Sequence, residues 1–210
     1  MYVVLMAMLA LNVSTEVLEG FAVVEESLNR TTDNSSRENV SIYRQLSEQF
    51  KSNPEKVQAW FDKATSVKRM SDSLYDFAQQ LKENIVKEAD GPDGNVFDIK
   101  HKDDLEAASH VMLAPGTGKG KLLYERVNHY REQILKMITD EHQRKTIESN
   151  LTTQLSKRAK AMGKNWQEYM FEDMPVSAAV TMLSKLQSDV RYAEGEVLHA
   201  LVANVDVKDI

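Results

Sequence analysis

The sequence has no cysteine, little glycine or proline, and no excess of basic residues. Without cysteine the chain can form neither a disulfide nor a cysteine-ligated metal site. Its 26 Lys and Arg are outnumbered by 32 Asp and Glu, which argues against nucleic-acid binding because phosphates require a basic surface. With 8 Gly and 4 Pro in 210 residues, and abundant Leu, Met, Ala, Glu, Gln and Lys, the composition predicts an all-α fold.

Patterns of catalytic and metal-binding residues are also missing. The histidines form no H-E-x-x-H motif, and the single E-x-x-H pair, Glu196 and His199, lacks the second pair that a di-metal helical bundle needs. The glycine-rich loop APGTGKG (114–120) departs from the phosphate-binding P-loop, because Lys121 stands where a second glycine should follow Gly116 and no strand precedes it. We therefore expect a protein that is not an enzyme and that uses no cofactor and no metal ion.

The chain begins instead with an uninterrupted apolar run from Met1 to Leu11, and its first charged residue is Glu16. As a helix the uncharged sequence is about 22 Å long, most of a bilayer core. Apolar residues continue at spacings of three and four into the charged sequence, which predicts one unbroken helix. The residues of this pattern are Val3, Met6, Ala10, Val13, Val17, Phe21, Val24 and Leu28.

The charges that follow this run indicate its orientation. Neither Lys nor Arg occurs before Arg30, whereas cytoplasmic flanks of membrane spans are rich in both. A transmembrane helix followed by a non-cytoplasmic domain is one interpretation. The other is a core helix of a soluble protein, because apolar runs of this length also occur there.

The rest of the chain reads as further helices. Ser and Asn residues within 31–39 predict a break, and apolar periodicity over 57–85 predicts a long helix that Asn53 caps and Pro54 begins. The Gly, Pro and Asp residues of 89–95 predict a turn. Shorter helices are expected over 104–113 and 123–138, and Thr139 or Asp140 can cap the next one.

The last helix is expected to start at Pro175 and to carry an almost unbroken apolar stripe, either as a spine of the domain or as a dimer contact. The stripe consists of Val176, Ala179, Leu183, Leu186, Val190, Ala193, Val197 and Leu201. The alternating pattern of 205–210 predicts a strand and the beginning of another segment.

Several stretches taken together resemble the N-terminal part of the GldM/PorM family, the motor subunit of gliding motility and type IX secretion. They are MAMLALNVSTEVLEGF, NPEKV, KEADGPDG, DDLEAASHVMLAPGTGKG, SKRAKAMGK and MPVSAAVTMLSKLQSDVRYAEGEVL, and they cover nearly all of the chain in order. The resemblance implies a transmembrane helix at 1–15, a periplasmic helical bundle at 16–204, and the start of a linker or next domain at 205–210. Family members also carry a short basic cytoplasmic stub with an arginine, and β-rich periplasmic domains, which this sequence does not include.

The resemblance further implies a homodimer, single-pass in the inner membrane, whose helices are enclosed by a ring of GldL/PorL-type subunits. Proton flow would drive movement that the periplasmic part delivers to downstream periplasmic or outer-membrane secretion components. Since 1–15 contains no charged residue, the proton-carrying carboxylate is expected on a partner.

Two sets of site residues follow from the resemblance and from the helical pattern. Tyr2 resembles the family's tyrosine at the start of the membrane helix. The set expected near the membrane partner or proton path is Tyr2, Val3, Met6, Ala10, Asn12 and Val13. The set expected to form dimer or bundle contacts is Val17, Phe21, Val24, Leu28, Ala179, Leu183, Leu186, Val190 and Ala193. The remaining interpretations are a membrane-anchored periplasmic sensor and a helical interaction module.

Overall fold

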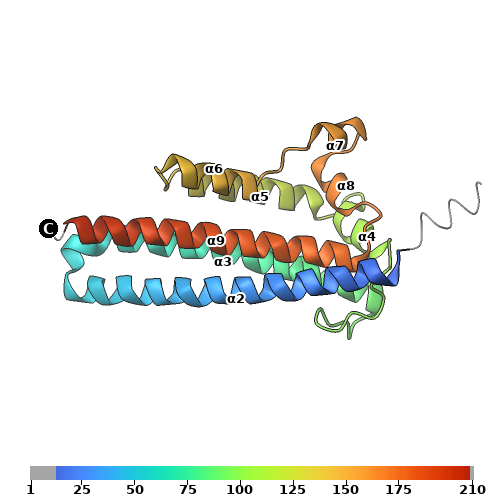
Figure 1. Ribbon diagram of the computed structural model, residues 1–210, viewed down its shortest axis with the longest axis horizontal. Helices are drawn as coiled ribbons and strands as arrows, with labels where there is room; N and C mark the ends of the chain where they lie inside the picture. Colours follow the sequence, from blue (N-terminus) through green and yellow to red (C-terminus); the bar gives the residue numbers. More distant parts are fainter. Residues whose placement is uncertain (1–12, 209–210) are drawn as a thin grey trace, which may run out of the picture. The chain divides into compact units, whose positions relative to one another are not determined.

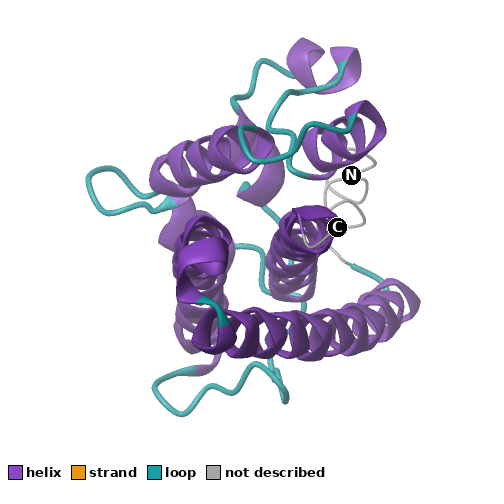
Figure 2. Ribbon diagram, turned by 90° about the vertical axis from the view of Figure 1, so that its left-hand side faces the viewer, coloured by secondary structure: helices purple, strands orange, loops and turns teal. Residues whose placement is uncertain are grey.

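A computed structural model describes residues 13–208, and within this range the chain forms eight helices (Figure 1). Figure 2 shows helices joined by loops, which confirms the all-α prediction. Numbered as in Figure 1, the helices are α2 (Thr15–Ser52), α3 (Pro54–Asp90), α4 (Ala107–Leu113), α5 (Gly120–Leu135), α6 (Glu141–Asn150), α7 (Lys157–Ala161), α8 (Trp166–Phe171) and α9 (Val176–Lys208).

Within the described residues, no helix has the length and apolarity that crossing a membrane requires. The predicted span at 1–15 lies almost wholly in 1–12, outside the described part, so it stays a prediction.

The described chain divides into two compact units. Unit 1 contains 13–27, 79–123 and 154–184. In its core, α4 packs against α8, and Met112 and Phe171 are each only 1% exposed. The start of α9 is held in this unit because its first amides donate to loop carbonyls: Val176 N to Asp104 O at 3.1 Å and Ser177 N to Lys102 O at 3.2 Å. These bonds satisfy amides that a helix start leaves without partners inside the helix.

Unit 2 contains 28–78, 124–153 and 185–208. Here α2, α3 and α9 run side by side, and α5 and α6 complete the bundle (Figure 1). The core is formed by apolar side chains at helical spacing on each element. Its most deeply buried members include Leu46, Val67, Ile134, Ile147, Val190, Val197 and Leu198.

Several local predictions are confirmed. Helix α3 begins at Pro54, and the Asn53 side chain accepts from the amide of Lys56, as a cap does. The turn after α3 has Gly91 at a φ of 94°, and Asp140 caps α6 by accepting from the amide of Gln143.

Three predictions were wrong. The helix predicted to run unbroken from the apolar start into the charged sequence is not continuous at Val13 and Ser14, because α2 begins at Thr15 and the Ser14 side chain caps it by accepting from the amide of Val17 at 3.2 Å. The polar segment 31–39 is not a break but part of α2, because Thr32 and Asn39 are buried and the other polar residues lie on the outer face. The alternation of 205–210 does not form a strand in its described part, because α9 continues to Lys208 and Val205 is buried on its inner face.

Candidate functional site

The residues predicted to lie near the membrane partner come first in the chain. All but one of them are outside the described residues, namely Tyr2, Val3, Met6, Ala10 and Asn12. Val13 lies just before α2 and is partly exposed.

The predicted contacts on α9 are mostly buried in the chain's own core. Ala179 and Leu183 are at most 1% exposed in unit 1, and Val190 and Ala193 are at most 1% exposed in unit 2. Leu186 alone of this set is partly exposed. This face of α9 therefore packs within the chain.

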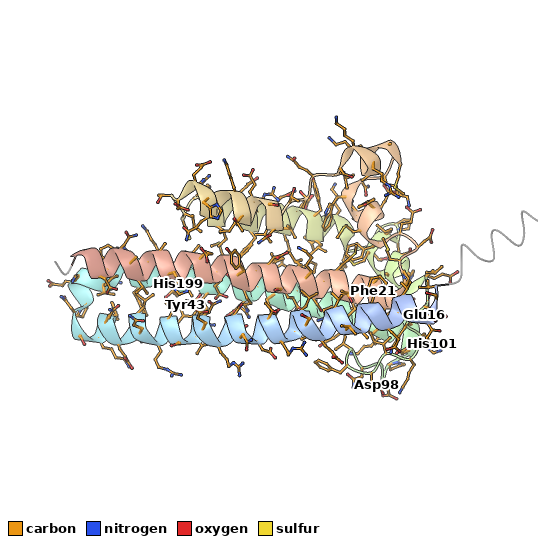
Figure 3. All side chains as sticks on the ribbon, in the orientation of Figure 1. Glu16, Phe21, Tyr43, Asp98, His101 and His199 are labelled. Atoms are coloured by element: carbon orange, nitrogen blue, oxygen red, sulfur yellow. The ribbon has the colours of Figure 1, made fainter. Side chains whose placement is uncertain are left out.

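The predicted contacts on α2 differ from one another in exposure. Phe21 and Leu28 are partly buried, and the Phe21 carbonyl accepts a hydrogen bond from Thr181 Oγ1 at 3.5 Å (Figure 3). Val17 and Val24 are 49% and 48% exposed.

Val17 and Val24 belong to an exposed face of α2. Val17, Gly20 and Val24 recur at spacings of three and four within α2, so they share this face. A Cβ atom added at Gly20 would meet nothing within 4 Å. We call Val17, Gly20 and Val24 the α2 stripe.

A buried polar cluster joins three helices of unit 1. The Ser184 hydroxyl on α9 donates to Glu25 Oε1 on α2 at 2.6 Å, and Lys82 Nζ on α3 lies 3.6 Å from the same oxygen. The Lys82 side chain is 5% exposed. Burial lowers the pKa of Lys82, although the negative charge of Glu25 raises it in part. A lysine this buried is unusual unless it is paired, so the cluster is a specific interhelical contact.

A larger network occupies the middle of unit 2. We call it the Glu194 network, after the α9 carboxylate at its centre. Asn39 Nδ2 donates to Glu194 Oε1 at 3.1 Å, and the Tyr43 hydroxyl donates to Oε2 at 2.6 Å (Figure 3). Arg191 Nη1 lies 3.1 Å from Glu194 Oε1 and 2.8 Å from Asp72 Oδ1 on α3. The network thus connects α2, α3 and α9.

The charges of the network shift one another's pKa values. Burial raises the pKa of Glu194, although the Tyr43 hydrogen bond and the Arg191 charge lower it in part. Burial would also raise the pKa of Asp72, but hydrogen bonds from Lys68 and Arg191 bring it below its ordinary value. Burial together with the nearby Glu194 charge raises the pKa of Tyr43, so this phenol stays protonated and remains a donor.

The backbones of α2 and α9 approach closely beside this network. Asn39 Nδ2 also donates to the carbonyl of Arg191 at 3.0 Å. A Cβ atom at Gly195 would lie 2.8 Å from Asn39 Oδ1, so a side chain at this position would displace the Asn39 amide. The contact depends on one relative axial position of the two helices.

Unit 2 also contains a buried pair of hydroxyl groups, those of Tyr130 and Ser71. The Tyr130 hydroxyl on α5 donates to the carbonyl of Val190 at 3.2 Å, and it lies 2.7 Å from Ser71 Oγ on α3. Tyr130 is 3% exposed and Ser71 is fully buried. Polar bonds therefore tie α5 to both α3 and α9.

The E-x-x-H pair on α9 is divided between two different partners. Glu196 Oε2 accepts from Gln143 on α6 at 2.7 Å, whereas His199 Nε2 lies 3.0 Å from Glu38 on α2 (Figure 3). Each side chain is used in a separate interhelical contact.

Sequence reasoning missed both polar clusters. Asn39 lies in the segment where the sequence predicts a break, and no sequence pattern predicts that Arg191 and Glu194 are buried. No local signal marks them: Glu194 and Gly195 follow Ala193 in sequence, and neither occupies a position of the apolar stripe of α9.

Arranged in this way, the clusters can hold the helices in register. Hydrogen bonds and ion pairs are directional, and a buried charge that loses its partner is strongly destabilising. Sliding one helix along another would separate the charges of Glu25 and Glu194 from their partners.

A comparison with protein families agrees with this architecture. A family model described as the GldM N-terminal domain matches residues 16–204, nearly the whole chain. No curated protein matches. Members of this family are structural components of a secretion system and are not known to be catalytic. The chain belongs to the GldM family, which has a role in gliding motility and type IX secretion.

Proposed function

We propose that the chain is a non-enzymatic subunit of an inner-membrane motor, driven by the proton motive force, that transmits mechanical work across the periplasm. The work powers type IX secretion and gliding. Family membership supports the cellular role, and the long helices support the mechanical one.

The observation that carries this proposal is the continuity of α2. Its 38 residues form one helix about 57 Å long, without the break that its polar segment predicts. A continuous helix transmits displacement, whereas a flexible linker of the same length would absorb it. The clusters around Glu25 and Glu194 couple α2 to α3 and α9, so displacement of one helix is passed to the others.

At the membrane, residues 1–15 form the span, with the main domain in the periplasm. Tyr2, Val3, Met6, Ala10, Asn12 and Val13 contact the partner, a ring of GldL/PorL-type subunits. Because this segment has no charged residue, the partner supplies the carboxylate that carries protons.

Two copies of the chain associate through the α2 stripe. Its valines are about half exposed, and the open surface at Gly20 permits close approach of a second helix. A seam with alternating spacings of three and four is the pattern by which paired helices pack.

The experiment that tests force transmission softens α2 within its polar segment. In the full-length protein, expressed from its own gene, Asp33 and Asn34 on the exposed face are both replaced by glycine. Each glycine disfavours the helix by about 1 kcal/mol relative to alanine. We expect secretion of a type IX substrate and gliding speed to fall, while the amount of membrane complex stays unchanged.

The matched control replaces the same two residues by alanine. Both variants lose the contact between Asn34 and Arg37, so the comparison isolates helix stiffness. The alanine variant should secrete and glide normally. Equal performance of the two variants would contradict the proposal.

A further inference from the structure

Unit 1 contains a cleft that the proposed function does not use. Its volume is about 420 Å³, and it lies between the end of α3, helix α4 and the loop 114–119. This volume is within the range of about 300–1,000 Å³ that is typical of small-molecule sites.

The cleft is lined by an excess of positive charge. Lys87 and Lys119 both line it and are exposed, and in the described part of the chain neither has a carboxylate partner. The acidic side chain in the lining, Glu88, has its Oε1 2.9 Å from His110 Nδ1. Two lysines therefore remain to attract an anion.

The loop that forms one wall is fixed rather than loose. Gly116 has a φ of 79°, and a Cβ atom at Gly118 would lie 2.7 Å from the carbonyl oxygen of Met112. The amides of Thr117 and Gly118 donate to the carbonyl oxygen of Ala114. The amide of Lys119 donates to the carbonyl oxygen of Val111 on α4 at 3.1 Å. These amides are used within the protein, so the loop does not bind phosphate through its backbone as a P-loop does.

The side chains supply what the backbone does not. Asn84 and Thr117 can each donate a hydrogen bond, and Val111 and Pro92 form apolar lining. We propose that the cleft binds a small molecule that carries a phosphate or carboxylate group on an apolar body. Lys87 and Lys119 bind the anionic group, and the apolar lining contacts the body.

The test uses fluorine NMR on the whole chain in lipid nanodiscs, with para-fluorophenyl phosphate and para-fluorobenzoate as probes. Bound probe broadens the fluorine line of the free ligand. We expect nanodiscs that contain the protein to broaden the lines of both anionic probes more than empty nanodiscs do. The line of neutral para-fluorobenzamide should not be broadened by the protein. Lys87→Gln and Lys119→Gln should each weaken binding about three- to tenfold, because each removes one exposed ionic contact.

Lys121→Gln is the matched control, because Lys121 is an exposed lysine two residues from Lys119 and does not line the cleft. It should leave the broadening unchanged. Loss of binding in Lys121→Gln equal to that in Lys119→Gln would overturn the proposal, as would equal broadening of the neutral amide or no broadening at all. The outcome is independent of the motor function, since none of the assays measures secretion or movement.

Discussion

Glu194 is a carboxylate with almost no access to water, and both of its oxygens have a donor. The side chain is 2% exposed, and its donors come from α2 and from its own helix. Such a group adds little net stability while its network is complete, but losing one partner leaves a buried charge behind. Single substitutions in this network should therefore have large effects on stability.

Replacing Arg191 by methionine removes the charge between Asp72 and Glu194 while retaining an apolar stem of similar length. We expect the free energy of unfolding to fall by about 3 kcal/mol, because Glu194 stays buried without its cation. Unfolding followed by circular dichroism measures the change. Lys68 is the other cation beside Asp72, and its side chain is 54% exposed. Lys68→Met should therefore lower the free energy of unfolding by less than about 1 kcal/mol. Equal losses would show that burial of the Glu194 network has no energetic consequence.

Acidification gives a second test of the same carboxyl. The pKa of Glu194 is raised in the folded protein, so the folded state binds its proton more readily than the unfolded state does. Stability due to this group therefore increases as the pH falls through the folded pKa towards the ordinary value of 4.5. Asp72, with its lowered pKa, begins to oppose this only at more acidic pH.

The comparison for this test is Glu194→Gln, which cannot titrate at that position. Relative to this variant, the wild type should become more stable between neutral pH and about pH 4.5, as thermal unfolding at a series of pH values would show. A relative gain on raising the pH instead would mean that the Glu194 pKa is lowered.

At the scale of the element, α3 could be predicted and α2 could not be predicted in full. Helix α3 has a local cap at Asn53, a Pro54 start and a regular apolar pattern, all of which are visible in sequence. In α2, the Ser and Asn residues of 31–39 are good caps locally. Burial of Asn39 against α9 overrides that preference, and its partner Glu194 is 155 residues away.

The same reason explains which part of the candidate site was predictable. The apolar stripe of α9 follows from spacing alone. The polar clusters depend on side chains that are brought together from three helices, and no local pattern specifies those pairs. Glu194 lies outside that stripe, and its partner Tyr43 is 151 residues away in the sequence.

The exposed face of α2 leads to a prediction about association. Because these 210 residues contain no cysteine, a single introduced cysteine is the one thiol in this part of the protein. Val17→Cys in the full-length protein should form a disulfide-linked dimer under oxidising conditions, since paired helices bring a seam residue close to its counterpart. Non-reducing electrophoresis of isolated membranes measures the product.

The control for this prediction is Val40→Cys, on the same helix and 52% exposed. It lies outside the α2 stripe and should remain largely monomeric. If the two cysteines crosslinked equally, the reaction would reflect random collision rather than a specific seam.

At the scale of the whole molecule, the question is which subunit carries the charge that moves through the membrane potential. Moving one charge through a potential of about 100 mV provides about 2.3 kcal/mol, but residues 1–15 carry no charge that could move. Under the proposed function, the proton carrier is therefore expected on another subunit. The fold contributes long coupled helices, and under the proposed function these transmit a movement generated elsewhere.

This division of labour predicts the composition of the complex. The full-length protein, extracted from membranes with mild detergent and weighed by native mass spectrometry, should carry two copies of itself and several copies of a small membrane protein with an intramembrane carboxylate. Replacing that carboxylate by its amide should abolish movement while leaving the complex intact, because the mechanical subunit is unchanged. Recovery of a monomer without a membrane partner would instead mean that the apolar start of the chain is a core helix. The motor assignment would then be wrong, although the buried networks and the anion-binding cleft would still stand on their own tests.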